Sequence, residues 1–287
     1  MIEDAFQELG ANRSALLGTI ILATFLFVAL FAPYIAPHDP TDQSLKNRLS
    51  PMSSEYPLGT DHLGRCILSR LIYGARISLP IGVIIAGTAF VIGVIIGTIS
   101  GYFGGIIDQI LMRLVDLLLA FPGLILALAI IASFGPGLSN AIMALVATGW
   151  TSYARMVRGS VLSVKEKEFV DGVRALGAGD FYIVMHHIIP NVVSPVIPMA
   201  MMGMGYAILA IAGLSFLGLG VQPPAPEWGT MLNDGRIYMK SAPQLMMLPG
   251  MAIMLTVLSF NLVGDALRDA FDPKKKDKIA SAMDVKR

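Results

Sequence analysis

The stretch SVLSVKEKEFVDGVRALGAGDFYIVMHHIIP, residues 160–190, is a charged segment that interrupts an otherwise apolar chain. Its first half predicts a short helix that ends at a glycine, and its second half predicts a helix that ends at Pro190. In an ordinary solvated connection, several apolar side chains of this segment would be left in water. They are Phe169, Val170, Val173, Leu176, Phe181 and Tyr182. The segment therefore indicates a rigid elbow at a membrane face onto which another protein docks.

The composition around this segment is that of a membrane protein. The chain has 287 residues, of which 55% are hydrophobic and 14% are charged, whereas soluble domains carry about 25% charged residues. The mean hydropathy is +0.68. A helix needs about 20 apolar residues to cross a bilayer core of ~30 Å. Stretches without Asp, Glu, Lys or Arg that are long enough are 14–37, 77–107, 117–154, 181–226 and 241–264. The composition predicts an all-α integral membrane protein.

Two of these stretches are too long for a single span. The sequence Phe-Gly-Pro-Gly at 134–137 is expected to break the third stretch into two helices. Pro190 and Pro195 separate the start of the fourth stretch from a span at about 196–220. We therefore predict six transmembrane helices.

The distribution of basic residues predicts the orientation of these spans. With both termini in the cytoplasm, 14 of the 21 Lys and Arg residues fall on the inner side, as the positive-inside rule requires. The run Lys274–Lys276 is then an anchor near anionic lipid. The first apolar run is longer than the core of a signal peptide, and acidic residues precede it, so we expect it to be a span. Segment 160–190 is predicted to be cytoplasmic.

Local signals within 160–190 predict its two helices in more detail. Ser163 and Glu166 fit a capping box at the start of the first helix. That helix is expected to run to Leu176 and to end at the glycines that follow. Asp180 can cap the second helix. Asp171 and Arg174 lie three residues apart and can pair with each other or with a partner protein.

The external connection, residues 38–75, contains a short helical pattern at 67–72. Two interpretations stay open for this pattern: an amphipathic helix on the outer membrane surface, or a packed cap over the bundle. Cys66 lies beside it and, as the single cysteine, forms no internal disulfide. We expect it to be a small buried apolar side chain.

A glycine stripe and two methionine clusters mark the predicted spans. Gly93, Gly97 and Gly101 repeat every fourth residue, which lets another helix pack closely. Flexible thioethers near 199–204 and 246–254 either line a passage for varied cargo or fill gaps between helices. Met202 and Tyr206 are our candidate pathway residues. Asp116 and Asp265, near inner helix ends, are expected as caps or as partners of Arg113 and Arg268.

Segment 160–190 resembles the "EAA" loop of ATP-binding-cassette (ABC) importer permeases. That pattern has Glu-Ala-Ala, a glycine four residues after the second alanine, and a distal proline. Asp171, Gly172 and Val173 stand at the Glu-Ala-Ala positions, and Gly177 and Pro190 at the glycine and proline. The triplet departs from the consensus, although Asp171 keeps the charge.

The resemblance extends to the dipeptide/oligopeptide permease subunits of the "C" type. It is carried by the blocks LGTDHLGRCILSRLIYGARISL (58–79), RLVDLLLAFPGL (113–124), LSFLGLGVQPPAPEWGTML (214–232) and LSFNLVGDALRDAFDP (258–273). Cys66 replaces the aspartate that is usual after Gly-Arg. The resemblance implies a type I ABC importer permease fold. Its parts would be an N-terminal helix and external segment (1–75), a five-helix core (76–265) and a cytoplasmic basic tail (266–287).

The resemblance also implies the partners of the chain. They would be a second, homologous permease, two cytoplasmic ATPases, an external solute-binding protein and membrane lipid, but no nucleic acid. The ATPases would bind the elbow, and the bundle would switch between inward-facing and outward-facing states by rigid-body movement. The implied coupling residues are Glu168, Asp171, Gly172, Val173, Arg174, Ala175, Leu176, Gly177 and Pro190. The implied location is a prokaryotic cell membrane.

No catalytic or cofactor chemistry is predicted for the chain itself. It lacks the GxxxxGK[ST] phosphate cradle, so ATP and Mg²⁺ would be bound by the partner ATPases. His186 and His187 are adjacent in a predicted helix and make poor joint metal ligands. A membrane-embedded enzyme is disfavoured because the motifs His-Glu-x-x-His and Gly-x-Ser-x-Gly are absent.

An ion-coupled secondary transporter is a second alternative, which would favour broken or charged midplane helices in paired repeats. The cargo stays open within the importer interpretation. Short peptides are favoured, with nickel or other metal chelates, opines or glutathione as alternatives.

Overall fold

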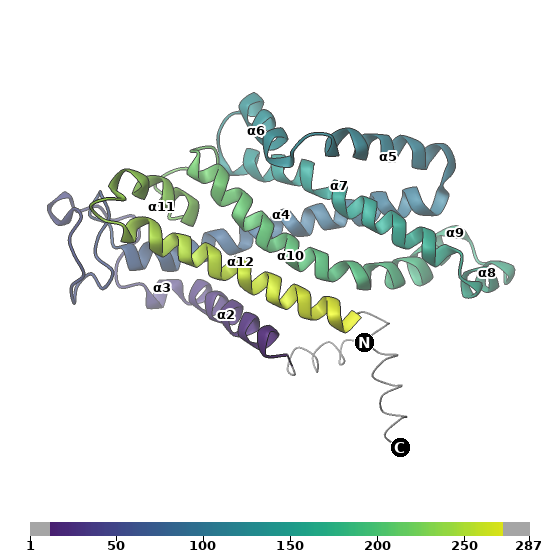
Figure 1. Ribbon diagram of the computed structural model, residues 1–287, viewed down its shortest axis with the longest axis horizontal. Coiled ribbons are helices and arrows are strands. Elements are labelled where there is room, and N and C mark those ends of the chain that lie inside the picture. Colours follow the sequence, from purple (N-terminus) through teal and green to yellow (C-terminus); the bar gives the residue numbers. More distant parts are fainter. Residues whose placement is uncertain (1–11, 272–287) are drawn as a thin grey trace, which may run out of the picture.

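The computed structural model describes residues 12–271 as an elongated bundle of helices (Figure 1). Its helices are α2 (Arg13–Leu30), α3 (Ala32–Ile35), α4 (Ile67–Phe103), α5 (Gly105–Leu119), α6 (Gly123–Phe134), α7 (Leu138–Lys165), α8 (Glu168–Ala175), α9 (Asp180–Ile183), α10 (Ile189–Phe216), α11 (Trp228–Gly235) and α12 (Gln244–Phe271). Shorter turns are η1 (Leu45–Asn47), the π-helical η2 (Val184–Ile188) and η3 (Arg236–Tyr238). The predicted all-α class agrees with this structure over the described residues.

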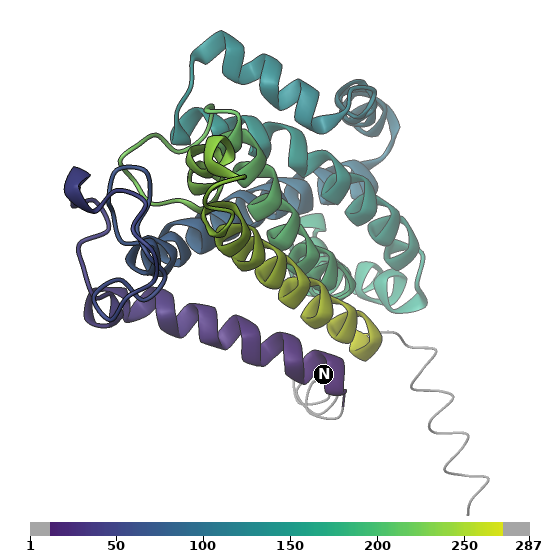
Figure 2. The same ribbon diagram turned by 60° about the vertical axis from the view of Figure 1, so that its left-hand side comes forward.

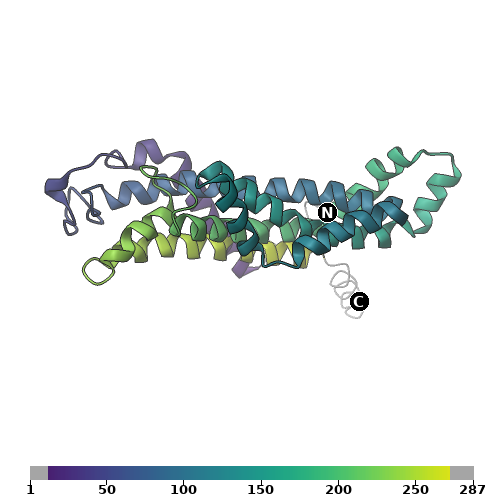
Figure 3. The same ribbon diagram turned by 90° about the horizontal axis from the view of Figure 1, so that it is seen from above.

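The two ends of the bundle are built differently (Figure 3). What we call the α11 end holds residues 38–66, α11 and η3. What we call the α8 end holds α8, α9 and the adjoining ends of α4, α5 and α7. Between them, α4 packs against α7, α10 and α2, and α12 packs against α10 and α2. Figure 2 shows α5 and α6 on one side of this bundle and α2 on the opposite side.

Within residues 12–271, four helices are long and apolar enough to cross a membrane: α2, α4, the continuous helix Asp180–Phe216 and α12. The pair α5 and α6 would add a fifth span, although the two helices are bent by 88°. α7 has sufficient length, 28 residues, but its Ser, Asn, Thr and Arg side chains lower its hydropathy. The sequence predicts six spans, whereas four or five helices within residues 12–271 meet the criteria of length and hydropathy.

The third predicted span is not a straight helix. The expected break is present, because α6 ends at Phe134 and Gly135 has a φ of +92°. A second break, at residues 120–122, was not predicted. Pro122 has no N–H to donate, and its ring disfavours a helical conformation of Phe121. α5 therefore ends at Leu119, and α6 turns away from it.

The short pattern at 67–72 proves to be the first two turns of α4, which continues without interruption to Phe103. A separate helix on the membrane surface is therefore wrong, and so is a separate cap over the bundle, although the segment is packed as the second interpretation expected. Ile67 is buried with Ala242 and Leu245, and the Trp228 indole donates a 3.1 Å hydrogen bond to the Leu71 carbonyl. Cys66, directly before the helix, is buried as expected. Tertiary contacts, which one helix pattern does not reveal, hold this segment in the bundle.

The glycine stripe of α4 lies against α7. A Cβ atom on Gly97 would approach the Ala154 carbonyl to 2.5 Å, and one on Gly93 would approach the Tyr153 Cβ to 2.4 Å. A Cβ on Gly101 would lie 2.8 Å from the Val161 Cβ. These two helices can lie this close only because the stripe has no side chains.

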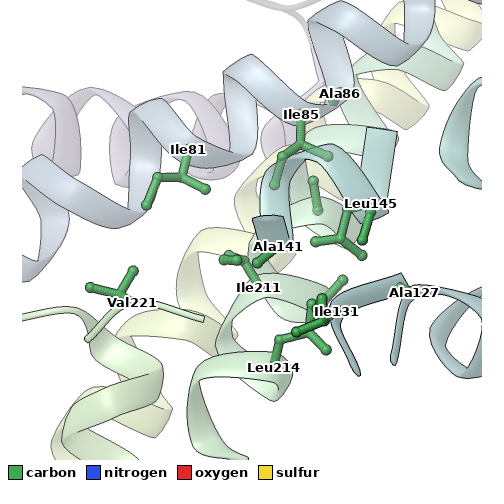
Figure 4. Packing of buried hydrophobic residues seen from close by; sticks show 13 residues of the cluster. Ile81, Ile85, Ala86, Ala127, Ile131, Ala141, Leu145, Ile211, Leu214 and Val221 are labelled. Atoms are coloured by element: carbon green, nitrogen blue, oxygen red, sulfur yellow. The ribbon is translucent and has the colours of Figure 1, made fainter. Parts of the chain in front are cut away.

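A buried apolar cluster joins the middle of the bundle (Figure 4). Ile81 and Ile85 of α4 contribute to it, together with Ile131 of α6, Leu145 of α7 and Ile211 of α10. α6 thus packs into the core, whereas α5, which runs along the long axis of the bundle (Figure 1), contributes no residue to this cluster. The cluster holds α4, α6, α7 and α10 as one body.

Candidate functional site

The α8 segment begins later than its sequence predicts. Ser163 lies inside α7, and Glu166 caps the C-terminus of that helix, so the predicted capping box is wrong. Val161 and Val164 of α7 are buried in the same cluster as Val170 of α8. Burial of this face continues α7 through Lys165, which overrides the local capping signal.

α8 ends where the sequence predicted. Gly177 follows its last turn with a φ of +84°, a conformation that side chains rarely adopt. The Gly177 N–H donates to the Arg174 carbonyl at 3.0 Å, and the Ala178 N–H donates to the Val173 carbonyl at 3.4 Å. A Cβ on Gly177 would meet no atom within 4 Å. The backbone conformation, and not lack of space, therefore requires this glycine.

The apolar side chains of the α8 segment divide into two groups. Val170 is fully buried and fastens α8 to the bundle. Leu176 and Phe181 are 88% and 79% exposed, and Tyr182 is 50% exposed. The segment is thus held in place by one face and presents an apolar surface on the other. Such a surface is typical of a site that another protein covers.

Polar contacts link this segment to α4. Arg174 pairs with Asp171, with 3.1 Å between the guanidinium Nη1 and the carboxylate Oδ1. The Tyr102 hydroxyl, in the last turn of α4, donates a 2.6 Å hydrogen bond to the Asp180 carboxylate. The Tyr102 hydroxyl raises the pKa of Arg174, and Asp171 and Asp180 raise it further. Gly179, and not Asp180, is the N-cap of α9; the Asp180 side chain contacts α4 instead.

The second predicted helix of segment 160–190 does not end before Pro190. It runs through η2 into α10, where Pro190 occupies the first turn. Within the continuous helix Asp180–Phe216, the missing N–H of Pro190 removes one backbone hydrogen bond. The wider π-helical turn directly before it leaves room for the ring. The Asn191 side chain donates to the His187 carbonyl at 2.7 Å. The elbow is therefore continuous with a core helix.

Ion pairs fix the neighbouring helix ends. Arg158 of α7 binds both carboxylate oxygens of Asp108 of α5, at 2.5 and 2.6 Å. Arg155 pairs with Asp116 at 2.6 Å, so the expected partner of Asp116, Arg113, is wrong. Sequence could not give this pairing, because it depends on α5 lying beside α7.

A cavity of about 420 Å³ lies between α4, the α5–α6 bend, α7 and α10. Both candidate pathway residues, Met202 and Tyr206, line it, as do Met199 and Tyr153. Met201 and Met204, by contrast, pack against buried clusters. The gap-filling interpretation therefore holds for Met201 and Met204, and a passage for cargo beside Met199 and Met202 stays a prediction. Sequence reasoning missed the α7 residues Thr148, Ser152 and Tyr153, whose only sequence signal is a shared helical face.

The α11 end contains a buried network of charges that sequence reasoning also missed. Arg65 pairs with Asp61 at 2.6 Å and with Asp234 at 3.0 Å. Arg70 lies 3.5 Å from Asp61 and 3.7 Å from Asp234. Both arginines are only 2% exposed. The network fastens the external connection to α4 and α11. Burial lowers the pKa of His62, which lies beside it.

Glu227 is the second buried acid of this end. Its carboxylate accepts a 2.9 Å hydrogen bond from the Thr230 N–H at the start of α11. The Thr230 hydroxyl lies 3.3 Å from the Glu227 N–H and completes a capping box. Burial raises the pKa of this carboxyl group.

Residues 12–271 contain no cluster of three or more His, Cys, Asp or Glu side chains that could hold a metal ion. The Lys274–Lys276 anchor and most of the basic tail fall outside the described residues, as do the acidic residues before the first span.

Comparisons with known proteins agree on one family. The family described as "Binding-protein-dependent transport system inner membrane component" matches residues 93–277. A second family, "N-terminal TM domain of oligopeptide transport permease C", matches residues 1–51. The structure of the MetNI methionine ABC transporter in an inward-facing conformation aligns with a TM-score of 0.57 at 21% identity. The alignment covers 70% of this chain and 96% of that one, and it shows a shared fold.

Several curated relatives are similar over nearly their full length. The dipeptide transport system permease protein DppC of Alkalihalophilus pseudofirmus is 44% identical, covering 95% of this chain and 90% of the relative. The DppC protein of Haemophilus influenzae is 43% identical over 92% of each chain. The glutathione transport system permease protein GsiD of Pectobacterium atrosepticum is 43% identical over 90% of this chain and 86% of the relative.

Proposed function

Because this chain belongs to the inner membrane components of binding-protein-dependent transport systems, we propose that it forms half of the pathway of an ATP-driven importer of short peptides. It is a multi-pass, non-catalytic permease of an ABC transporter complex, and the ATPase subunits of that complex bind ATP. The observation that carries the proposal is the 44% identity to a dipeptide permease over 95% of the chain.

Cargo is the finer part of the proposal. Two relatives named DppC favour dipeptides. The GsiD relative, at nearly the same identity, favours glutathione, which is itself a modified tripeptide. Nickel or other metal chelates and opines remain alternatives that rest on the sequence resemblance alone. The ligand retained by the co-purified solute-binding protein distinguishes these cargoes.

The proposed assembly follows from the family. The chain pairs with a second, homologous permease in a prokaryotic cell membrane, two ATPases bind at the α8 end, and a solute-binding protein binds at the α11 end. Six spans are α2, α4, the bent pair α5–α6, α7, α10 and α12, with both termini cytoplasmic. In support, the start of α2 and the end of α12 are the ends of these two helices that lie nearer to the α8 end (Figure 1). We also propose the three parts that the resemblance implies, 1–75, 76–265 and 266–287. Their boundaries lie inside helices α4 and α12.

α8 is the proposed coupling helix. Its docking contacts are Asp171, Val173, Arg174 and Leu176, supported by Glu168, Gly172 and Ala175, and Gly177 provides the turn. Leu176 is 88% exposed. This exposure supports the role, because exposed apolar surface is typical of a site that a partner protein covers. Movement of the ATPases would reach the core through Val170 and through the continuous helix that contains Pro190.

The turn at Gly177 provides the test. We expect Gly177→Val to reduce ATP-driven uptake of Ala-Ala in proteoliposomes with the complete complex. A β-branched residue at positive φ costs about 1–3 kcal/mol, and about 1.4 kcal/mol corresponds to a tenfold change in rate. The matched control is Gly179→Val. Gly179 has the same open surroundings but an extended conformation, with a φ of −73°.

We expect the control to retain uptake, and both variants to insert and assemble with the ATPases. Equal uptake by the two variants would contradict the coupling role of the α8 turn. Absence of ATP-dependent peptide uptake by the unmodified complex, with its own solute-binding protein, would contradict the proposed function itself.

A further inference from the structure

The cavity between α4, the α5–α6 bend, α7 and α10 has the size of a ligand site. Its volume, about 420 Å³, falls in the range of about 300–1,000 Å³ that small-molecule sites occupy. Tyr206 and Phe121, which are 59% and 54% exposed, lie at its open side. Ala86, Ala89 and Tyr153 are nearly buried and lie at its closed side. The cavity is therefore a one-sided recess in the bundle.

No residue that lines this recess carries a charge. Its walls are aliphatic, aromatic and thioether groups, with a few hydroxyls. The Thr148 hydroxyl donates to carbonyls of its own helix at 3.2 Å, so it adds little polarity. The hydroxyl groups of Ser152, Tyr153 and Tyr206 are the other polar side-chain groups of the lining.

The charges nearest to the recess in sequence neutralise each other. Arg155 follows the lining residue Tyr153 by two residues, and Asp116 precedes the lining residue Leu118 by two. These two side chains form an ion pair of 2.6 Å. Neither is therefore an unpaired charge that could hold the ammonium or carboxylate group of a peptide.

A zwitterionic peptide has two parts with opposite preferences for such a recess. Burying a charged terminus without a partner costs several kcal/mol, whereas burying an apolar side chain gains about 25 cal/mol per Å². We propose that this recess is a subsite for an uncharged, apolar side chain of the imported peptide, whose charged termini stay outside it. The inference rests on the proposed function and adds the chemical class that this subunit accepts.

The thioethers of the lining explain how such a subsite serves many peptides. Met199 and Met202 are unbranched and polarizable, so they adapt to side chains of different shape. The volume of the recess then limits the size of the peptide side chain that enters it. Its uncharged lining excludes charged peptide side chains.

Filling the recess is the first test. Gly149 lines it, and a Cβ there would meet only the Ala89 Cβ, at 3.5 Å. We expect Gly149→Leu to lower the ratio of Leu-Leu uptake to Ala-Ala uptake about tenfold, because lost methylene space in an apolar pocket discriminates by about this much. The control is Gly87→Leu, at a glycine of α4 that is outside the recess and has no neighbour within 4 Å.

Enlarging the recess is the second test and predicts the opposite sign. Tyr206 is largely exposed, so Tyr206→Ala removes bulk with little effect on the fold. We expect it to raise the Leu-Leu to Ala-Ala ratio. Both tests use the complete complex with one solute-binding protein, whose own preference cancels when variants are compared.

The outcomes separate the inference from the proposed function. If the unmodified complex imports both peptides but neither Gly149→Leu nor Tyr206→Ala changes the ratio, the subsite is wrong while the importer stands. If Gly149→Leu lowers uptake of both peptides equally, the subsite is likewise wrong. If Gly149→Leu does not assemble, an unchanged ratio in Tyr206→Ala alone overturns the proposal.

Discussion

The α11 end and the α8 end of this bundle treat their charged groups in opposite ways, whereas both ends expose apolar side chains, such as Ile237 and Leu176. At the α11 end, Arg65 and Arg70 are buried and pair with Asp61 and Asp234 inside the same chain. At the α8 end, Arg174 pairs with Asp171 in water, with side chains that are 51% and 68% exposed. The apolar side chain of Leu176 lies in water beside them.

This difference indicates which charged groups find their partners within the chain. The α11 end pairs its buried arginines with carboxylates of the same chain, although the buried Nδ1 atoms of His38 and His62 have no hydrogen-bond partner. At the α8 end the pair of Arg174 with Asp171 is exposed, and water screens it, so it is worth about 0–1 kcal/mol. We infer that the buried charges around Arg65 reach their final contacts during folding, whereas the exposed surface around Leu176 is completed only in the complex.

The largest expected effect comes from breaking the buried network. Arg65→Met leaves the buried Asp61 and the half-buried Asp234 with one cation fewer, and breaking a buried pair costs about 3–5 kcal/mol. We expect a clear fall in the thermal unfolding temperature of the purified protein in detergent. The matched control is Arg174→Met at the α8 end, which should change stability by less than about 1 kcal/mol. Equal losses in the two variants would contradict the contrast between the ends.

A pH-dependent effect of intermediate size is expected at Glu227. Because burial raises its pKa above the unfolded value, the folded state holds the proton more tightly. Stability from this group is complete below the unfolded pKa and is lost as pH rises through the folded pKa. Over that window the free energy of unfolding falls by about 1.4 kcal/mol per pH unit. Glu227→Gln removes this dependence.

Thermal unfolding of Glu227→Gln and of the unmodified protein, measured in detergent across this pH window, tests the expectation. The variant should gain stability relative to the unmodified protein as pH rises. The lowered pKa of His62 acts in the opposite direction, but both proteins contain His62, so its contribution cancels in the difference. A difference that stays constant with pH would show that Glu227 does not titrate differently in the folded state.

The smallest expected change in stability is at the α8 end. Tyr102→Phe removes the 2.6 Å hydrogen bond to Asp180, a loss of about 0.5–1.5 kcal/mol. We nevertheless expect fewer peptides imported per ATP hydrolysed, because this bond joins α4 to the elbow. Tyr34→Phe, at an 86% exposed tyrosine of α3, is the control. An unchanged ratio of transport to hydrolysis in Tyr102→Phe would remove this residue from the coupling path.

Sequence reasoning succeeded where a local rule acts alone. The end of α8 at Gly177 follows from a glycine that can adopt positive φ, and the Asp171–Arg174 pair follows from helical spacing. It failed where packing competes with a local rule. Ser163 has a good capping sequence, yet burial of Val161 and Val164 keeps it inside α7. Pro190 is a good helix stop, yet a π-helical turn lets the helix pass through it.

The sequence by itself determined the membrane class, the apolar segments, the elbow and the family, because composition and periodicity act through the solvent and through neighbouring residues. Only the tertiary structure decided the bend of α5 against α6, the pairing of Arg155 with Asp116, the buried network around Arg65 and the uncharged recess beside Tyr206. Each of these depends on side chains from helices distant in the chain. Their distances and burial arise only when the helices pack.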